Sequence, residues 1–245
     1  YRMLINKENA DTIYICGLQY SGFLMTLAAK LSNVKNIVVS IHGSDWDNPD
    51  KSLRKRILMY IIEPLTVKLC DSFFTVCESA QQTVRALKAS PSHNAGVVYN
   101  AFPNISVDNV PYGRFKNEQR IADDKIIVAV VGRVVAAKGH QYIIDAINKL
   151  ESHDFIFIIV GDGPYLNEYK LQCNNAISEK RVRLLGIRND VYSILRDSDI
   201  FLFATLNENH SIALLEAVNM KCAVLATNVG GNPEIIENGR SGILI

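Results

Sequence analysis

Residues 201–237, FLFATLNENHSIALLEAVNMKCAVLATNVGGNPEIIE, decide the fold of this chain. An apolar strand runs into a polar loop, and we predict that a helix begins at about Ser211 and ends near Lys221. A second strand at 223–226 leads into a Gly-Gly turn at 228–231, and a short helix follows. Two strands that each lead into a helix are typical of an open α/β sheet, which binds anionic ligands at the carboxyl ends of its strands.

The rest of the chain alternates short apolar runs with helical patterns. We predict strands at 12–16, 36–41, 72–76, 96–98, 125–131, 154–160, 181–184, 199–203, 223–226 and 242–245. Helices are predicted at 21–31, 51–69, 79–89 (with Glu78 or Ser79 as N-cap), 139–150, 165–176, 189–196, 211–221 and 233–237. This alternation predicts an α/β protein with parallel sheets, built as two Rossmann-like, doubly wound lobes that face a central cleft.

The periodicity lapses between 103 and 124, where Pro, Gly, Asn and charged residues dominate. We therefore predict a first lobe at 1–108, a linker at 109–124 and a second lobe at 125–245. The chain begins at Tyr1 without a methionine and stops at Ile245 inside a predicted strand. We expect a chain truncated at both ends, so that the first lobe is incomplete and the second lacks its last helices.

Composition narrows the class of protein. Among 245 residues, 48% are hydrophobic and 21% are charged, as in ordinary globular proteins, and the net charge of +1 predicts no nucleic-acid partner. No apolar run approaches the roughly 20 residues that span a bilayer, and no signal peptide is visible. The five cysteines are scattered, which predicts reduced thiols in a cytoplasmic protein: Cys16, Cys70, Cys77, Cys173 and Cys222.

Two cations follow the strand predicted at 125–131. Gly132 allows a ligand to approach the backbone closely, Arg133 comes next, and Lys138 with Gly139 opens the following helix. Two positive charges near a helix N-terminus predict a diphosphate clamp; the alternative is a solvated loop with surface cations. A phosphate loop of the Walker type is excluded, because Lys138 precedes the glycine and the glycine spacing is wrong.

Two carboxylates, Glu208 and Glu216, lie eight positions apart within the stretch quoted first. Glycosidase chemistry would use such a pair as acid and nucleophile, but Glu216 lies on a helix beside the predicted phosphate site. A carboxylate there suits two hydrogen bonds from a ribose diol, and Glu208 at the loop tip suits a transferred sugar. The alternative for each is a surface charge.

Weaker patterns are interpreted in structural terms. The segment 161–164, Gly-Asp-Gly-Pro, predicts a tight turn with Pro164 as the first residue of a helix, and it lacks the spacing of a dinucleotide-binding loop. Asp45 with Asp47 and Asp197 with Asp199 match a D-x-D metal pattern, but no third ligand is evident, and we predict no metal site.

Two features of the first half have both a functional and a structural interpretation. His42 ends a strand before a glycine, so it is either a structural residue or one that faces the predicted cleft. The helix at 51–62 is basic and apolar, which suits either an ordinary core helix or peripheral contact with the inner face of an anionic membrane.

Taken together, the chain resembles the group 1 (GT4-like) glycosyltransferases of GT-B fold. The matching motifs in the second half are Val131-Gly132-Arg133 with Lys138-Gly139, Gly161-Asp162-Gly163-Pro164, Gly186, the pair Glu208 and Glu216, and Val229-Gly230-Gly231-Asn232-Pro233-Glu234. Weaker landmarks in the first half are His42-Gly43, Cys77-Glu78-Ser79 and Tyr99-Asn100-Ala101. The resemblance covers essentially the whole chain.

The resemblance implies a retaining transferase that moves a sugar from a nucleotide diphosphate sugar to a glycan, a lipid-linked or a small-molecule acceptor, as in polysaccharide biosynthesis. It implies no metal and no cofactor besides the nucleotide sugar, with the first lobe on the acceptor side. By the same resemblance, the donor diphosphate is bound by Gly132, Arg133, Lys138, Ser211 and Ile212, and the donor sugar by Glu208, Asn209 and His210. The ribose is bound by Glu216, and the nucleobase is bordered by Gly186, Ile187 and Arg188. Catalysis is assigned to Glu208 and His42.

The chain departs from the family pattern after Glu208, where the family usually has Gly and this chain has Asn209, His210 and Ser211. We expect sugar preference to be decided there. Two alternatives remain open. One is a sugar-nucleotide epimerase of the same fold, and the other is a non-catalytic subunit.

Overall fold

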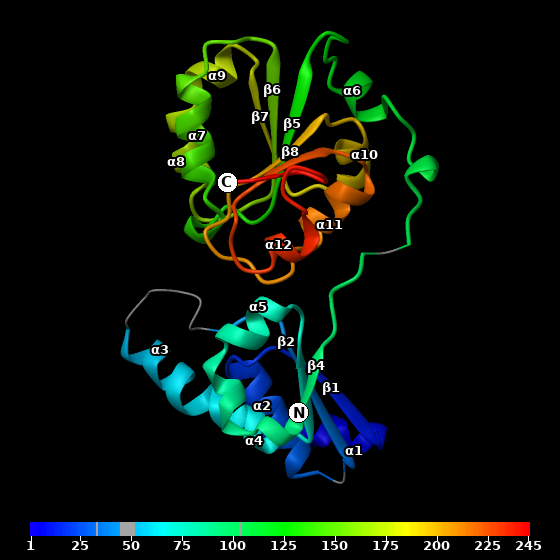
Figure 1. Cartoon of the computed structure of the whole chain (residues 1–245), viewed down its shortest axis with the longest axis vertical. Helices are drawn as coiled ribbons and strands as arrows, with labels where there is room; N and C mark the ends of the chain where they lie inside the picture. Colours follow the sequence, from blue (N-terminus) through cyan, green and yellow to red (C-terminus); the bar gives the residue numbers. More distant parts are fainter. Residues whose placement is uncertain (33, 45–51, 103) are drawn as a thin grey trace. The chain divides into compact units, whose positions relative to one another are not determined.

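The computed structural model describes residues 1–32, 34–44, 52–102 and 104–245. The chain divides into two compact units, Tyr1–Asn100 and Ala101–Ile245, each with its own parallel sheet (Figure 1). The predicted α/β class with parallel sheets is therefore confirmed. The predicted lobe boundaries at 108 and 124 stay predictions, and in the structure the segment 109–124 belongs to the second unit.

The first unit contains a four-stranded parallel sheet in the order β1-β2-β3-β4. Its apolar core lies between the sheet and the helices α2 and α4. The strands are β1 (Thr12–Cys16), β2 (Asn36–Ile41), β3 (Ser72–Thr75) and β4 (Asn94–Val97), and the helices are α1 (Arg2–Glu8), α2 (Tyr20–Lys30), α3 (Leu53–Ile57), α4 (Glu63–Leu69) and α5 (Glu78–Thr83), with 3-10 turns at Arg85–Ala89 and Pro91–His93.

Two details of the first unit correct the sequence predictions. The helix predicted at 51–69 is described from Leu53 as α3, a π-helical turn at Leu58–Ile62 and α4, whose second residue is Pro64. A proline has no N–H to donate, and a wider turn just before it accommodates the loss. The N-cap of α5 is Cys77, whose Sγ accepts from the Ala80 N–H at 3.4 Å, and not Glu78 or Ser79.

The second unit contains a six-stranded parallel sheet in the order β10-β9-β8-β5-β6-β7. Helices α7, α8 and α9 cover one face, and α6, α10 and α11 cover the other (Figure 1). The strands are β5 (Ile126–Val131), β6 (Phe155–Val160), β7 (Val182–Gly186), β8 (Ile200–Phe203), β9 (Ala223–Ala226) and β10 (Ile243–Leu244). The helices are α6 (Arg114–Glu118), α7 (His140–Lys149), α8 (Leu166–Gln172), α9 (Asn174–Ser178), α10 (Val191–Arg196), α11 (Ile212–Asn219) and α12 (Asn232–Ile235), with 3-10 turns at Val107–Asn109 and Ala136–Lys138.

The strand order reverses between β5 and β8. From β5 the chain adds β6 and β7 on one side of the sheet, and it then returns to place β8, β9 and β10 on the other side. At such a reversal the connections leave the two central strands in opposite directions, which opens a crevice at their carboxyl ends. The loops after β5 and β8 therefore meet where an α/β sheet binds ligands.

Among the described residues, no helix is long and apolar enough to cross a membrane. The five cysteines carry free thiols, and all except Cys16 are buried.

Candidate functional site

The loops after β5 and β8 are joined by backbone contacts that only glycine permits. Gly139, the N-cap of α7, adopts φ 65°, and a Cβ added there would lie 1.8 Å from the Ala204 carbonyl oxygen. The Ala137 carbonyl accepts from the Leu206 N–H at 2.9 Å and from the Thr205 hydroxyl at 3.1 Å. The helix start that carries Lys138 is thus held against the loop that carries Glu208.

Two further glycines bring neighbouring loops into the same cluster. Gly161 lies against Gly132, with a built Cβ 1.8 Å from the Gly132 oxygen, and Gly230 lies against Glu208 in the same way at 1.7 Å. The loops after β5, β6, β8 and β9 therefore pack together at one edge of the sheet. The tight turn predicted after β6 is present, but Pro164 lies within the turn, because α8 begins only at Leu166.

The structure pairs two predicted site residues directly. The Lys138 Nζ donates to Glu208 Oε2 in an ion pair whose side chains are only 19% and 16% exposed. The same ammonium lies 5.5 Å from the centre of the Phe203 ring, within cation–π range. Arg133 is exposed, and no carboxylate of the described residues forms an ion pair with it. One cation of the predicted clamp is therefore engaged and the other is open to an anion.

The second carboxylate, Glu216, receives a hydrogen bond from a residue on a neighbouring helix. Tyr192 on α10 donates its hydroxyl to Glu216 Oε1 on α11 at 3.0 Å. Burial raises the pKa of Glu216, and this hydrogen bond opposes the shift because it stabilises the ionised form. Burial, followed by the hydrogen bond, raises the pKa of Tyr192 to about 12. No short-range sequence pattern links two residues on different helices.

A hollow of about 470 Å³ lies beside this cluster and joins two sets of predicted residues. Gly132 and Arg133, assigned to the diphosphate, line it together with Ile187 and Arg188, assigned to the nucleobase border. Ile187 is 77% exposed, so an apolar surface is available beside the hollow. Gly186, with φ 65°, ends β7 just before this segment.

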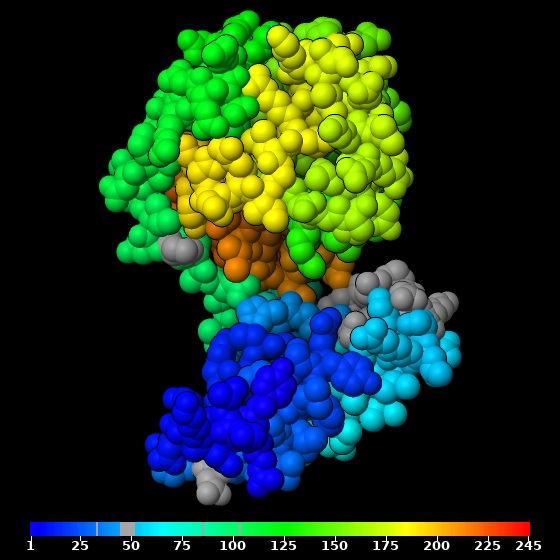
Figure 2. Space-filling view, turned by 180° about the vertical axis from the view of Figure 1, so that it is seen from behind, coloured from blue at the N-terminus to red at the C-terminus, as the bar shows by residue number. Residues whose placement is uncertain are grey.

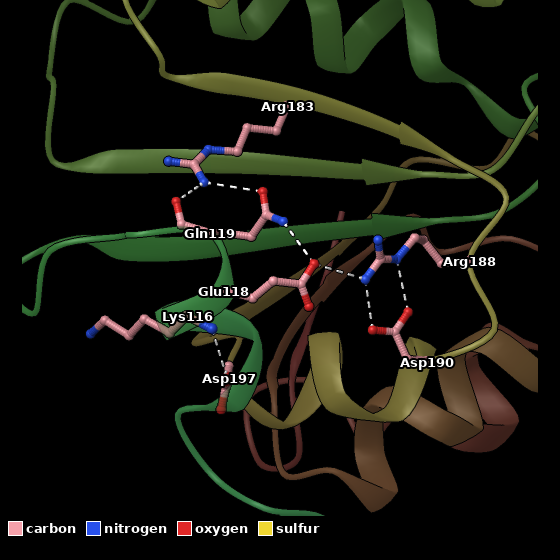
Figure 3. A network of polar contacts seen from close by, with 7 residues as sticks. All are labelled: Lys116, Glu118, Gln119, Arg183, Arg188, Asp190 and Asp197. Carbon is pink, nitrogen blue, oxygen red and sulfur yellow. Dashed lines mark hydrogen bonds and ion pairs between the residues drawn. The ribbon is translucent and has the colours of Figure 1, made fainter.

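The guanidinium of Arg188 is held by two acidic residues (Figure 3). It donates from Nε and Nη2 to the two oxygens of Asp190, both at 2.8 Å, and from Nη2 to Glu118 on α6 at 3.2 Å. The hydrogen bonds from Arg188 lower the pKa of Asp190. The side chain of Arg188 is therefore engaged in two ion pairs: the one with Asp190 lies within the segment between β7 and α10, and the one with Glu118 fastens that segment to α6.

The residues after Glu208 form the start of α11. Ser211 is the N-cap, and its hydroxyl accepts from the Leu214 N–H at 3.3 Å, as the predicted helix start requires. Ile212 is the first helical residue and is exposed. His210 is buried, and burial lowers its pKa against the opposing effect of the Glu234 and Glu208 charges.

The remaining predicted residues lie elsewhere. Asn209 precedes His210 in the same loop and is partly buried. His42 belongs to the first unit, where its Nε2 lies 3.1 Å from the Ser40 hydroxyl and burial lowers its pKa. Its assignment to catalysis stays a prediction.

The D-x-D pairs have a structural explanation where the structure describes them. Asp197 accepts from the backbone N–H groups of Gly113 at 2.6 Å and Lys116 at 2.9 Å and so fastens the start of α6 (Figure 3). Asp199 accepts from the Ile127 N–H at 2.8 Å and joins β8 to β5. Asp45 and Asp47 lie outside the described residues, within which no cluster suited to a metal ion is found.

The comparison with known families decides the identity of the chain. The profile of the family described as "Glycosyl transferases group 1" matches residues 113–245, more than half of the chain. The chain belongs to the group 1 glycosyltransferases. The matched region of this glycosyltransferase chain contains α6, the second sheet and every predicted donor-site residue.

Characterised relatives agree with the family. The chain is 26% identical to an Escherichia coli UDP-Gal:alpha-D-GlcNAc-diphosphoundecaprenol alpha-1,3-galactosyltransferase, over 99% of this chain and 64% of that protein. It is 35% identical to the GPI3 subunit of phosphatidylinositol N-acetylglucosaminyltransferase from Saccharomyces cerevisiae, over 52% of this chain and 29% of that protein. The chain thus spans less than two thirds of the length of these relatives.

Solved structures show that the fold is that of the GT-B glycosyltransferases. Anabaena HepE in complex with UDP-glucose aligns with a TM-score of 0.79 at 20% identity, covering 96% of this chain and 64% of that one. The galactosyltransferase WaaB of the lipopolysaccharide outer core aligns with a TM-score of 0.67 at 17% identity, covering 100% of this chain and 64% of that one. The predicted GT-B class is therefore confirmed, and the chain represents part of the full fold.

Proposed function

We propose that the protein transfers a sugar from a nucleotide diphosphate sugar to an acceptor, with retention of anomeric configuration and without a metal ion. The observation that carries this proposal is the ion pair of Lys138 with Glu208 at the reversal of the sheet. It puts a cation suited to a diphosphate beside a carboxylate suited to sugar hydroxyls.

The proposed chemistry requires charge stabilisation on the leaving group. The bond between the anomeric carbon and the diphosphate oxygen breaks, a bond from that carbon to an acceptor hydroxyl oxygen forms, and the hydroxyl proton passes to the leaving diphosphate or to solvent. Negative charge develops on the nucleoside diphosphate as its bond to the sugar breaks. Arg133, Lys138 and the N–H groups at the start of α11 offset this charge, so no metal is needed. When Lys138 turns to the diphosphate, the Glu208 carboxylate is released to accept hydrogen bonds from the sugar.

The relatives' names suggest the classes of donor and acceptor. The E. coli relative is named for UDP-galactose and a diphosphoundecaprenol acceptor, and the yeast relative for phosphatidylinositol. We propose a nucleotide-sugar donor and a glycan or lipid-linked acceptor. The sugar choice is assigned to Asn209, His210 and Ser211, where the chain leaves the family pattern.

An exposed stripe on the first unit supports a further proposal, peripheral contact with an anionic membrane. Leu53, Ile57 and Ile61 are 74%, 38% and 51% exposed at helical spacing, and the exposed cations Arg54 and Arg56 lie on the same segment. Figure 2 shows this light-blue to cyan segment at the surface of the first unit. An apolar stripe flanked by cations suits the interface of an anionic bilayer.

Thermal stabilisation by UDP, GDP and ADP tests the donor site. Nucleotide at a hundredfold excess over its Kd stabilises the folded protein by about 2.7 kcal/mol. The double variant Arg133→Ala, Lys138→Ala is expected to lose this stabilisation. The matched control Lys149→Ala, Lys170→Ala removes two exposed cations of the same unit and should keep it.

An unchanged nucleotide affinity in the Arg133 and Lys138 variant would refute the clamp. Product analysis then separates the enzyme classes: a transferase releases nucleoside diphosphate and a glycosylated acceptor, whereas an epimerase returns an isomerised nucleotide sugar. The anomeric proton coupling of the product tests retention, and full activity after chelation of divalent ions is expected.

A further inference from the structure

Two packed helices place the Tyr192 hydroxyl on the Glu216 carboxylate. Tyr192 is the second residue of α10, and its ring packs into the apolar cluster that also contains Leu214 and Ala217 of α11. Glu216 lies on α11 between these two residues in the chain. Because the ring is positioned by this packing, its hydroxyl meets Glu216 Oε1 from a fixed direction at 3.0 Å.

This hydrogen bond leaves most of the carboxylate available. An ionised carboxylate offers about four acceptor positions, and one phenolic hydroxyl occupies a single position. Among the described residues, no hydrogen bond reaches Glu216 Oε2, and the residue is only half-buried. Both hydroxyls of a vicinal diol can therefore donate to a carboxylate that is already oriented.

The segment that carries Tyr192 also borders the hollow. Arg188 and Val191 line the cavity of about 470 Å³, and Tyr192 follows Val191 directly. The ion pair of Arg188 with Glu118 connects this segment to α6, and the pair of Arg188 with Asp190 lies within the segment (Figure 3). Tyr192 thus follows a segment that an internal ion pair orders and that one further ion pair fastens to α6.

We propose that Tyr192 is a positioning residue that orients Glu216 toward a ribose diol and so sets a preference for ribonucleotides over 2′-deoxyribonucleotides. This inference rests on the proposed function, since it takes Glu216 as the ribose contact. A carboxylate that is oriented before binding loses less side-chain freedom when the ligand binds. A nucleotide without the 2′-hydroxyl keeps only one of the two donors and therefore gains less from that orientation.

Calorimetric titration of the full 245-residue chain tests the proposal. The probes are three pairs: UDP, GDP and ADP, each with its 2′-deoxy counterpart. The wild-type chain should bind one ribonucleotide about tenfold or more tightly than its 2′-deoxy form, because one hydrogen bond to a charged group contributes at least this much binding free energy. Tyr192→Phe should reduce this ratio at least about threefold, and Glu216→Gln should bring it close to one.

Two further variants serve as controls for this test. Tyr142→Phe removes a hydroxyl from a tyrosine that is 60% exposed on α7, and it should keep the wild-type ratio. The double variant Tyr192→Phe, Glu216→Gln should bind like Glu216→Gln alone, because Tyr192 acts through Glu216.

The outcomes separate the two proposals. If the wild-type chain binds none of the six nucleotides, the proposed function fails and this inference fails with it. If it binds a ribonucleotide preferentially and Tyr192→Phe keeps the full ratio, Tyr192 has no positioning role while the donor site stands. Additive losses in the double variant, or a wild-type chain without preference, would also overturn the role of Tyr192.

Discussion

Replacing Gly230 by alanine tests how closely two loops of the donor site must pack. Gly230 follows β9 in the turn that lies against Glu208, and it adopts φ 53°. An added Cβ would lie 1.7 Å from the Glu208 carbonyl oxygen and 2.9 Å from its carbon. Both are backbone atoms, so no side-chain rotation relieves the clash, and the loop that carries the Glu208 carboxylate must move.

The loss in free energy of unfolding expected for Gly230→Ala has two parts. A residue with a Cβ in the left-handed region costs about 1–2 kcal/mol relative to glycine. Forcing extra volume into a packed site costs about 1–3 kcal/mol more. Gly239 isolates the first part, because it has φ 79° and nothing within 4 Å of an added Cβ. Gly230→Ala should therefore cost about 1–3 kcal/mol more than Gly239→Ala.

Amide hydrogen exchange of β8 and β9 measures the difference within the second unit alone. Exchange through opening of the structure accelerates about tenfold for each 1.4 kcal/mol of lost stability. Gly230→Ala should accelerate exchange in these strands by a further factor of about 5 to 150 over Gly239→Ala. Equal or slower exchange in Gly230→Ala would show that the loop carrying Glu208 moves aside without a loss of stability, and it would refute the tight contact.

Two other predictions concern acid stability and membranes. His140 is buried, and mainly because of this burial its pKa is lowered to about 4. As the pH falls from 6.5 to 4, the unfolded chain therefore binds a proton at this histidine that the folded chain does not bind. Acid thus lowers the stability of the folded protein. His140→Leu should remove up to about 3 kcal/mol of this acid destabilisation, seen as a flatter dependence of Tm on pH, and an unchanged dependence would contradict it. For the exposed stripe, sedimentation with phosphatidylglycerol but not phosphatidylcholine vesicles is expected. The double variant Arg54→Glu, Arg56→Glu should abolish this vesicle binding, because each lost cation removes about 1 kcal/mol of membrane-binding free energy. The control Lys149→Glu, Lys170→Glu should keep it. Equal binding to both lipids would exclude an electrostatic contact.

Elements set by local chemistry could be predicted. The alternation of apolar strands and helical patterns located the strands of both sheets to within two residues at every end. Ser211 as a helix start followed from its capping hydroxyl. The N-cap of α5 and the place of Pro164 before α8 were predicted wrongly, because a thiol cap and a turn before the helix have weak sequence signals. The helix at Arg2–Glu8 was not predicted at all.

Contacts between distant segments could not be predicted. Nothing near Gly113 in the chain indicates that Asp197 caps its segment, and nothing near Glu216 indicates Tyr192. Each pairing depends on which helices share a face of the sheet. The roles of the site residues stay predictions, and the structure adds which of them are neighbours: Lys138 with Glu208, and Arg133 with Ile187 and Arg188 around one hollow.

The sequence by itself determined the α/β class, the family motifs and the residue types of a donor site, because strand and helix periods and helix caps are local properties of the chain. Only the tertiary structure decided that β8 pairs with β5, so that the loops carrying Lys138 and Glu208 meet. Strand order arises from side-chain packing between segments far apart in the sequence, which no local period records.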